Sequence, residues 1–249
     1  MMMHIQCEKG DVGRYVILPG DPGRVEKIAS YLDHPEKIAE NREFVTYTGE
    51  LEGEKVSVCS TGIGGPSAAI AMEELVKCGA DTFIRVGTCG GISEKPAPGD
   101  LIIATSAVRQ EGTSLHYMPV EFPATSNTEV LMELIHGAET LNMPFHTGIV
   151  QSKDSFYGQH EPGRMPVARE LEEKWNAWKQ AGVLASEMET AALFVTASVL
   201  HVRCGAVFLM IWNQERDKAG YQDKKTEDTT GAIETAIEAM RNLIRKDRK

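Results

Sequence analysis

The sequence predicts an α/β fold in which a mostly parallel or mixed β-sheet is covered by helices. Short apolar runs typical of strands alternate with stretches of helical periodicity along the chain. The composition, 42% hydrophobic and 25% charged residues, is ordinary for a folded globular protein. No repeat, low-complexity linker or shift in composition divides the chain, so we expect a single domain spanning residues 1–249.

The predicted strands are runs of mainly apolar, often β-branched residues. In chain order they span residues 15–18, 44–51, 54–60, 82–86, 101–104, 146–150 and 206–212. Glu52-Gly53 separates the second run from the third, which predicts a β-hairpin. The last run has no charged residue, which predicts a strand buried on both faces.

The predicted helices have apolar residues that recur every three or four positions. They span residues 22–32, 66–78, 127–141 and 232–244. Pro22 suits the first position of a helix. The irregular stretches 151–165 and 213–228 directly follow strands, and ligands of open α/β sheets bind beyond the carboxyl ends of strands. These stretches are therefore candidate binding loops.

The formal net charge of −10 argues against non-specific binding to nucleic acids or membranes. An anionic ligand would have to be held by a few local cationic residues. The five cysteines are odd in number and contain no C-x-x-C pair, which fits neither a disulfide framework nor a zinc site. The start of the chain lacks the pattern of a signal peptide, and no apolar run reaches about 18 residues. We expect a cytoplasmic protein with reduced thiols.

Two glutamates, Glu187 and Glu189, directly precede the apolar run from Ala191 to Leu200. Such a run is typical of a buried segment, and carboxylates are rarely buried without a partner. On the first turn of a helix the two side chains would lie roughly 200° apart, so they would face different surroundings. Either they interact favourably with the dipole of that helix, or at least one of them binds a ligand.

Two arginines lie where a strand ends or gives way to a loop. Arg24 follows the first strand in Pro19-Gly20-Asp21-Pro22-Gly23-Arg24, and Arg85 lies near the end of an apolar strand before Gly87. A phosphate between the two guanidinium groups and a helix N-terminus would suit their bidentate geometry. The alternatives are a solvated arginine in a simple turn for Arg24 and a structural carboxylate partner for Arg85. Residues 60–67 resemble a phosphate loop but match no known phosphate motif, so a tight turn is the alternative there.

These segments combine with others into a recognisable set. The set is Pro19-Gly20-Asp21-Pro22-Gly23-Arg24, Asn41-Arg42-Glu43-Phe44, residues 59–67, Arg85-Val86-Gly87-Thr88-Cys89-Gly90 and Glu187-Met188-Glu189. Together these motifs resemble the hexameric nucleoside phosphorylases, in particular the bacterial members that act on uridine. The resemblance runs from about His4 to the last helix. It implies a central mixed, partly barrel-like sheet flanked by helices, and a homohexamer built as a trimer of dimers with active sites shared within each dimer.

The resemblance also implies residue roles. The phosphate site would contain Gly20, Arg24, Arg85, Thr88 and, from a neighbouring subunit, Arg42. The ribose site would contain Thr88, Met188, Glu189 and, from a neighbouring subunit, His4. The base site would contain Gly90, Phe156, Gln159, Arg164, Glu187 and Ile211. A potassium site between subunits would be lined by Glu43, Ile63 and Ser67.

The implied reaction is the reversible phosphorolysis of uridine to uracil and ribose 1-phosphate, with deoxyuridine or thymidine as weaker substrates. Inorganic phosphate is a co-substrate, and no cofactor is required. Attack at C1′ creates positive charge on the sugar and negative charge on the base. We expect three catalytic residues: Arg24 and Arg85 neutralise and aim the phosphate, and an ionised Glu189 stabilises the sugar.

Recognition of the base determines the substrate. By the resemblance, Phe156 packs on the base and the Gln159 amide pairs with O2 and N3–H, because an amide can both donate and accept. Family members often place an arginine two residues after this glutamine, but the position is Glu161, so Arg164 or Arg216 would have to substitute. Purine-cleaving relatives use an aspartate after the last strand, where this chain has Asn213. This difference favours pyrimidines.

Three alternatives remain open. A purine nucleoside phosphorylase or a hydrolytic nucleosidase could share the scaffold, although a hydrolase would not need Arg24, Arg42 and Arg85. A non-catalytic nucleoside-binding protein would keep the base pocket while tolerating loss of the phosphate ligands. The expected partners are therefore small molecules and further copies of the chain, without nucleic acid or membrane.

Overall fold

The ten strands of the computed structural model, which describes all 249 residues, belong to one mixed sheet. They are β1 (Tyr15–Pro19), β2 (Asp33–Asn41), β3 (Phe44–Leu51), β4 (Glu54–Cys59), β5 (Thr82–Gly91), β6 (Leu101–Gln110), β7 (Ala124–Thr125), β8 (Phe145–Lys153), β9 (Ala185–Glu187) and β10 (Arg203–Trp212). Their order is β10-β6-β8-β9-β5-β1-β4-β3-β2, with β7 beside β6. Because β10 also pairs with β5, strands β5, β10, β6, β8 and β9 close into a barrel, which confirms the expected partly barrel-like sheet.

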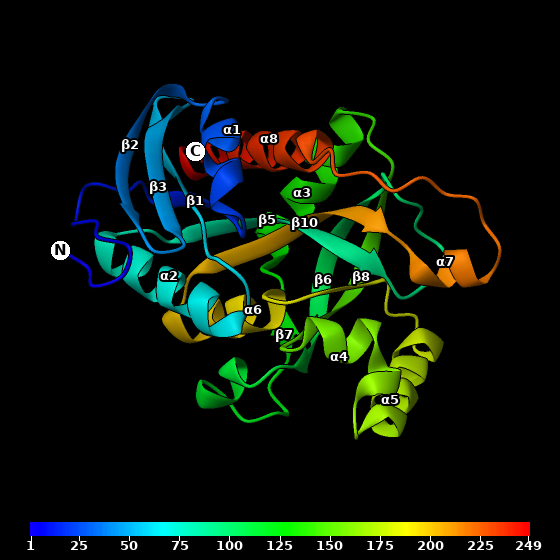
Figure 1. Cartoon of the computed structure of the whole chain (residues 1–249). Coiled ribbons are helices and arrows are strands. Elements are labelled where there is room, and N and C mark those ends of the chain that lie inside the picture. Colours follow the sequence, from blue (N-terminus) through cyan, green and yellow to red (C-terminus); the bar gives the residue numbers. More distant parts are fainter.

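Helices cover the sheet on both faces (Figure 1). They are α1 (Val25–Ala29), α2 (Gly65–Cys78), α3 (Thr128–Thr140), α4 (Phe156–His160), α5 (Ala168–Gln180), α6 (Thr190–Leu200), α7 (Gln214–Lys218) and α8 (Thr230–Asp247). Helix α3 packs against α8, and α2 packs against α6. None of the helices combines the length and hydrophobicity that crossing a membrane would require.

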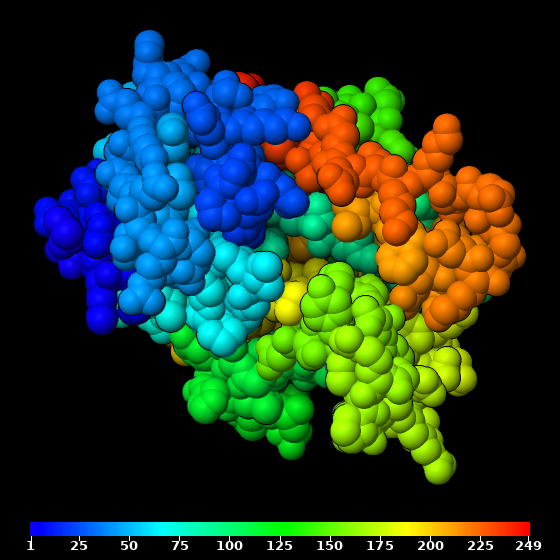
Figure 2. Space-filling view, in the orientation of Figure 1, coloured from blue at the N-terminus to red at the C-terminus, as the bar shows by residue number.

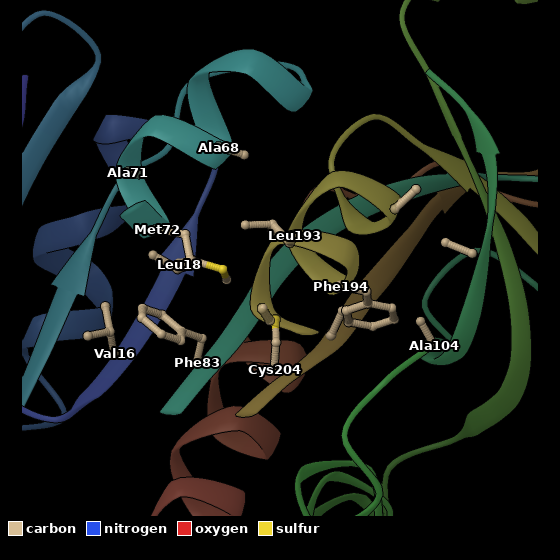
Figure 3. Close-up of a cluster of buried hydrophobic side chains, with 14 of the residues drawn as sticks. Val16, Leu18, Ala68, Ala71, Met72, Phe83, Ala104, Leu193, Phe194 and Cys204 are labelled. Atoms are coloured by element: carbon tan, nitrogen blue, oxygen red, sulfur yellow. The ribbon is translucent and has the colours of Figure 1, made fainter. Parts of the chain in front are cut away.

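The two faces of the sheet carry separate hydrophobic cores. Along β1, Val16 and Leu18 belong to the core shared with α2 and α6, whereas Ile17 belongs to the core shared with α1, α3 and α8. Successive side chains of a strand point to opposite faces, so a continuous apolar run fills both cores. Figure 3 shows the first core, to which α2 contributes Met72 and α6 contributes Leu193.

The structure confirms the predicted strands but corrects one predicted helix. The helix expected at 22–32 is wrong, because residues 22–24 form a 3-10 turn and α1 ends at Ala29. The Asp21 carboxylate accepts a hydrogen bond from the Gly23 N–H at 2.9 Å, which tightens this turn. The sequence also missed β2, an edge strand with mostly exposed side chains, and α5, which has no buried residue. Neither element has a continuous apolar pattern.

Gly205 in β10 allows α3 to pack closely on the sheet. A Cβ at this position would lie 2.5 Å from Val130 Cγ1 and 3.2 Å from Leu134 Cδ1. We expect Gly205→Ala to lower the free energy of unfolding by about 1–3 kcal/mol, because both helix side chains must move. Urea denaturation followed by circular dichroism measures this change. At Gly163 a Cβ meets nothing within 4 Å, so Gly163→Ala is the matched control. Equal losses in the two variants would contradict the close packing of α3.

Candidate active site

A cavity of about 660 Å³ lies among the segments that follow β1, β4, β8 and β9, beside the carboxyl ends of β5 and β10. Figure 2 shows the hollow, bordered by the blue segment after β1, the cyan start of α2, the yellow-green α4 and the orange segment after β10. The arginine side of the cavity contains Gly20, Arg24 and Arg85, and the aromatic side contains Phe156, His160 and Trp212. Chain segments that are far apart in the sequence therefore meet at one opening.

The arginine side is built by the parallel pairing of β1 with β5. Leu18 lies beside Arg85 in the ladder, so the loop after β1 meets the carboxyl half of β5. Gly20 lies so close to the Arg85 side chain that a Cβ would be 3.1 Å from its Nη1 atom. The absence of a side chain at Gly20 therefore leaves the Arg85 guanidinium facing the cavity.

Arg85 and Glu189 form a buried ion pair on the cavity wall. Arg85 Nη2 lies 2.5 Å from Glu189 Oε2, and each side chain is only 5% exposed. Arg85 Nη1 has two longer contacts, 3.4 Å to Thr61 Oγ1 and 3.5 Å to the Leu18 carbonyl, and its buried Nε has no partner at all. A buried guanidinium with unused donors next to a cavity is suited to bind an anion.

Glu189 is also held by the segment after β4. Its Oε1 atom accepts a hydrogen bond from the Gly64 N–H at 2.6 Å. In the same segment, the N–H groups of Thr61 and Gly62 donate to the carbonyls of Pro19 and Gly20 at 2.9 Å. These N–H groups are thus used within the protein. Residues 60–64 form a tight turn before α2 that fixes Glu189 and the loop after β1, which matches the alternative to a phosphate loop.

Glu187 differs from Glu189 in both position and partners. The expectation that both acids lie on the first turn of a helix is wrong, because Glu187 ends β9 and α6 begins at Thr190. The Glu187 carboxylate accepts hydrogen bonds from the N–H groups of Glu189 and Thr190 at 2.9 and 3.0 Å, and from Ser152 Oγ. Burial, and next the charge of Glu189, raise the pKa of Glu187. Glu187 therefore caps α6, while Glu189 contacts the arginine.

Arg24 completes the arginine side. Its side chain is 26% exposed, and its nearest acidic partner is Asp21, 3.8 Å away. Burial lowers the pKa of the Arg24 guanidinium; Asp21 opposes this shift, and the positive charge of Arg85 adds to it. Thr88, further along β5, lines the same cavity. Two guanidinium groups that repel each other across a cavity would be stabilised by an anion bound between them.

The aromatic side is formed by α4 and the end of β10. The rings of Phe156 and His160 have centroids 4.3 Å apart, and the His160 ring lies 6.0 Å from that of Trp212. Phe156 is 50% exposed, and Gly90, Met188 and Ile211 also line the cavity. Burial, and next the charge of Lys153, lower the pKa of His160. This side offers a flat apolar surface for a planar group.

Several predicted site residues lie outside this cavity. Gln159 lines an adjoining pocket, where its Nε2 donates to Ser186 Oγ at 2.9 Å. Arg164 is largely exposed and pairs with Glu161 at 2.8 Å. Arg216, the other arginine considered for the base, pairs with Asp223 at 2.5 Å. Neither arginine is in place to contact a base within the same chain.

The two residues expected from a neighbouring subunit, Arg42 and His4, are also absent from the lining. Arg42 is exposed in the turn between β2 and β3. His4 is bound to Glu74, with 2.7 Å between His4 Nδ1 and Glu74 Oε1. Glu43 and Ile63 line the cavity, while Ser67 lies beside Glu43.

Sequence reasoning missed Lys153, a buried cation on the cavity wall, as well as His160 and Trp212. The signal for Lys153 was its position at the start of the loop 151–165, directly after a strand. No group of three or more histidine, cysteine or acidic side chains is arranged to hold a metal ion. All five cysteines are free and buried.

Comparison with known proteins places this chain in a family. Residues 14–246 match the model of the phosphorylase superfamily. The chain is 54% identical to a uridine phosphorylase of Treponema pallidum, with 98% of this chain and 95% of that protein aligned. It is 46% identical to a uridine phosphorylase of Thermococcus kodakarensis, over 99% and 88%, and 39% identical to a guanosine phosphorylase of Halorubrum lacusprofundi, over 97% of each. The chain belongs to the phosphorylase superfamily.

Proposed function

We propose that this protein is a pentosyltransferase that catalyses the reversible phosphorolysis of uridine to uracil and ribose 1-phosphate. The observation that carries the proposal is the buried Arg85–Glu189 pair, which lies on a cavity that also contains Arg24 and an aromatic side. Full-length relatives that are named uridine phosphorylases support the choice of reaction and substrate.

In this proposal the phosphate binds between Arg24 and Arg85, near Gly20 and Thr88. Both guanidinium groups are positively charged, and Arg85 Nε has no partner within the protein. Glu189 binds the ribose hydroxyls, with Met188 beside it, and its negative charge stabilises the cationic sugar as the glycosidic bond breaks. Because Arg85 contacts Glu189, the groups that bind phosphate and sugar are held in fixed relation, which favours an aligned attack on C1′.

The proposed base lies against Phe156 on the aromatic side, near Gly90, Ile211 and Glu187. The structure offers a reason to favour pyrimidines over purines at Asn213. Its Nδ2 atom donates to the carbonyls of Ser93 and Pro96 at 2.8 Å, and its Oδ1 atom accepts from the N–H groups of Glu215 and Arg216. This side chain is fully buried, and all its hydrogen-bonding groups have partners within the protein, so it cannot deliver a proton to a purine.

The hydrolytic alternative is less well supported than phosphorolysis. Water would need no guanidinium ligands, whereas Arg24 and Arg85 both line the cavity. A non-catalytic binding protein would likewise have no use for an ionic pair that costs desolvation energy.

The remaining expectations depend on a second copy of the chain. Arg42 and His4 would enter a neighbour's cavity in a hexamer assembled as a trimer of dimers. A potassium site between subunits would use Glu43, Ile63 and Ser67; Ser67 Oγ already lies 2.7 Å from Glu43 Oε1. Two further expectations do not depend on a second copy of the chain. Inorganic phosphate is the co-substrate, and no cofactor is proposed. The cytoplasmic location stays a prediction.

We expect the purified protein to consume uridine only when phosphate is present. Ultraviolet absorbance with uridine, thymidine and inosine, each with and without phosphate, measures the reaction. Uridine should react fastest, because the residue after β10 is Asn213, whose amide cannot protonate a purine. Equal turnover without phosphate would assign the protein to the nucleosidases, and a preference for inosine would assign it to the purine branch.

Glu189→Gln should reduce kcat with uridine by about 10²–10³-fold, because the amide keeps the shape of the side chain but lacks the negative charge. Thermal denaturation should show that the variant is folded. The exposed carboxylate Glu173 on α5 provides the control, and Glu173→Gln should keep full activity. Full activity in Glu189→Gln would exclude the proposed role in sugar stabilisation.

Gln159→Ala should mainly relax the choice of base, because the variant loses the amide that we expect to pair with uracil. In the structure this amide bonds to Ser186, so base binding requires it to exchange that partner. The ratio of kcat/KM for uridine to that for inosine is the measurement. An unchanged ratio would mean that Gln159 does not read the base.

A further inference from the structure

Lys153 is a buried cation that the reaction outlined above does not use. It ends β8, it is only 4% exposed, and it lines the same cavity as Phe156 and Trp212. An ammonium group has three hydrogen-bond donors. Lys153 Nζ uses one of them, to Ser186 Oγ at 2.5 Å. Lysine is rarely buried without a partner, so the two remaining donors need an explanation.

Neutralisation of a nearby carboxylate does not explain Lys153. No acidic side chain lies within 4.0 Å of its Nζ atom. The Glu187 carboxylate is turned towards Ser152 and the start of α6, and the Glu189 carboxylate is turned towards Arg85 and Gly64. A lysine present only to balance these charges would make direct contact with one of them.

The pKa of the Lys153 ammonium group lies close to neutral pH. Burial lowers the pKa of its ammonium group to about 8, while Glu187, Glu189 and Cys89 oppose that shift. The fourth titratable neighbour is His160, whose own pKa is lowered by burial and then by the charge of Lys153. At neutral pH the lysine is therefore mostly protonated and the histidine is mostly neutral.

Lys153 is the cation that lines the aromatic side of the cavity; Lys225, 4.4 Å from the centre of the Trp212 ring, is not part of the lining. Its Nζ atom lies 5.9 Å from the centre of the Phe156 ring, and the other cations of the lining, Arg24 and Arg85, belong to the arginine side. Arg164 and Arg216 are paired with Glu161 and Asp223 outside the cavity. A base that stacks on Phe156 would bring its ring carbonyl groups towards this ammonium group.

We propose that Lys153 is a catalytic residue that stabilises the negative charge on the departing base. This inference rests on the proposed phosphorolysis. A phosphate oxygen forms a bond to C1′ as the C1′–N1 bond breaks, and the electron pair of that bond leaves with N1 and spreads onto the base carbonyl oxygens. The ammonium group donates a hydrogen bond to one of these oxygens. The proton of the hydrogen phosphate dianion finally reaches the base through solvent, which gives neutral uracil and the ribose 1-phosphate dianion.

The test compares leaving groups of different acidity in single-turnover reactions. Lys153→Met should slow cleavage of uridine by about 10²–10³-fold, because a preorganised charge-stabilising donor is lost. The loss should be at least about tenfold smaller for 5-fluorouridine, since fluorine makes the base a better leaving group that needs less help. Lys153→Arg, which keeps the charge, should recover much of the rate. Lys174→Met on the exposed face of α5 is the control and should change neither rate.

The possible outcomes separate this inference from the proposed function. If the unmodified protein does not cleave uridine with phosphate, the proposed function fails. If it does, and Lys153→Met slows both nucleosides equally or neither of them, Lys153 does not stabilise the leaving base. Should Lys153→Met fail to fold, Lys153→Gln gives the same comparison, because it keeps a donor for Ser186 without the charge.

The pH dependence provides a second readout. In the unmodified protein the rate should fall as the pH rises through about 8, because the ammonium group of Lys153 loses its proton. Lys153→Arg should move this fall to higher pH, since a guanidinium group stays charged. An identical pH profile in the two proteins would overturn the role of Lys153.

Discussion

The ion pair between Arg85 and Glu189 is the interaction on which the cavity depends. It joins the middle of β5 to the start of α6, and both charges are almost completely removed from water. Burying two such groups costs several kcal/mol, which their attraction offsets only when further hydrogen bonds are present. Gly64 supplies one of these bonds to Glu189, but Arg85 Nε is left without a partner. The folded chain therefore holds a charged site whose donors are not fully satisfied, which favours binding of an anion.

The closed barrel places this pair at a meeting point of segments. Strand β5 pairs with β1, with β9 and with β10, so its carboxyl half lies beside the loops that follow all three. These three neighbours of β5 contribute different chemistry: a guanidinium from Arg24 after β1, a carboxylate from Glu189 after β9, and an aromatic surface from Trp212 at the end of β10. Without the pairing of β10 with β5 that closes the barrel, Trp212 would not lie beside the groups that follow β1 and β9.

This arrangement places positive charges on two sides of the cavity. The protein carries a net charge of −10, yet the cavity lining contains Arg24, Arg85 and Lys153. The two guanidinium groups lie on the arginine side, and the ammonium group lies near the Phe156 ring. In the proposed reaction, the guanidinium groups face the entering phosphate, and negative charge moves from this side to the other while Glu189 lies beside the sugar between them. Cations on both sides suit a reaction that starts and ends with an anion.

The sequence by itself determined the apolar strands, the long helices α2, α3 and α8, and the candidate residues Arg24, Arg85 and Glu189, because apolar periodicity and short motifs are local properties. Only the tertiary structure decided which side chains meet. Glu187 turned to cap α6, Arg164 and Arg216 found acidic partners outside the cavity, and Gln159 bonded to Ser186. Arg85 and Glu189 are 104 positions apart, and Lys153 and Ser186 are 33 apart. Contacts over such separations depend on how the strands are ordered in the barrel, and a buried lysine looks no different in the sequence from a solvated one.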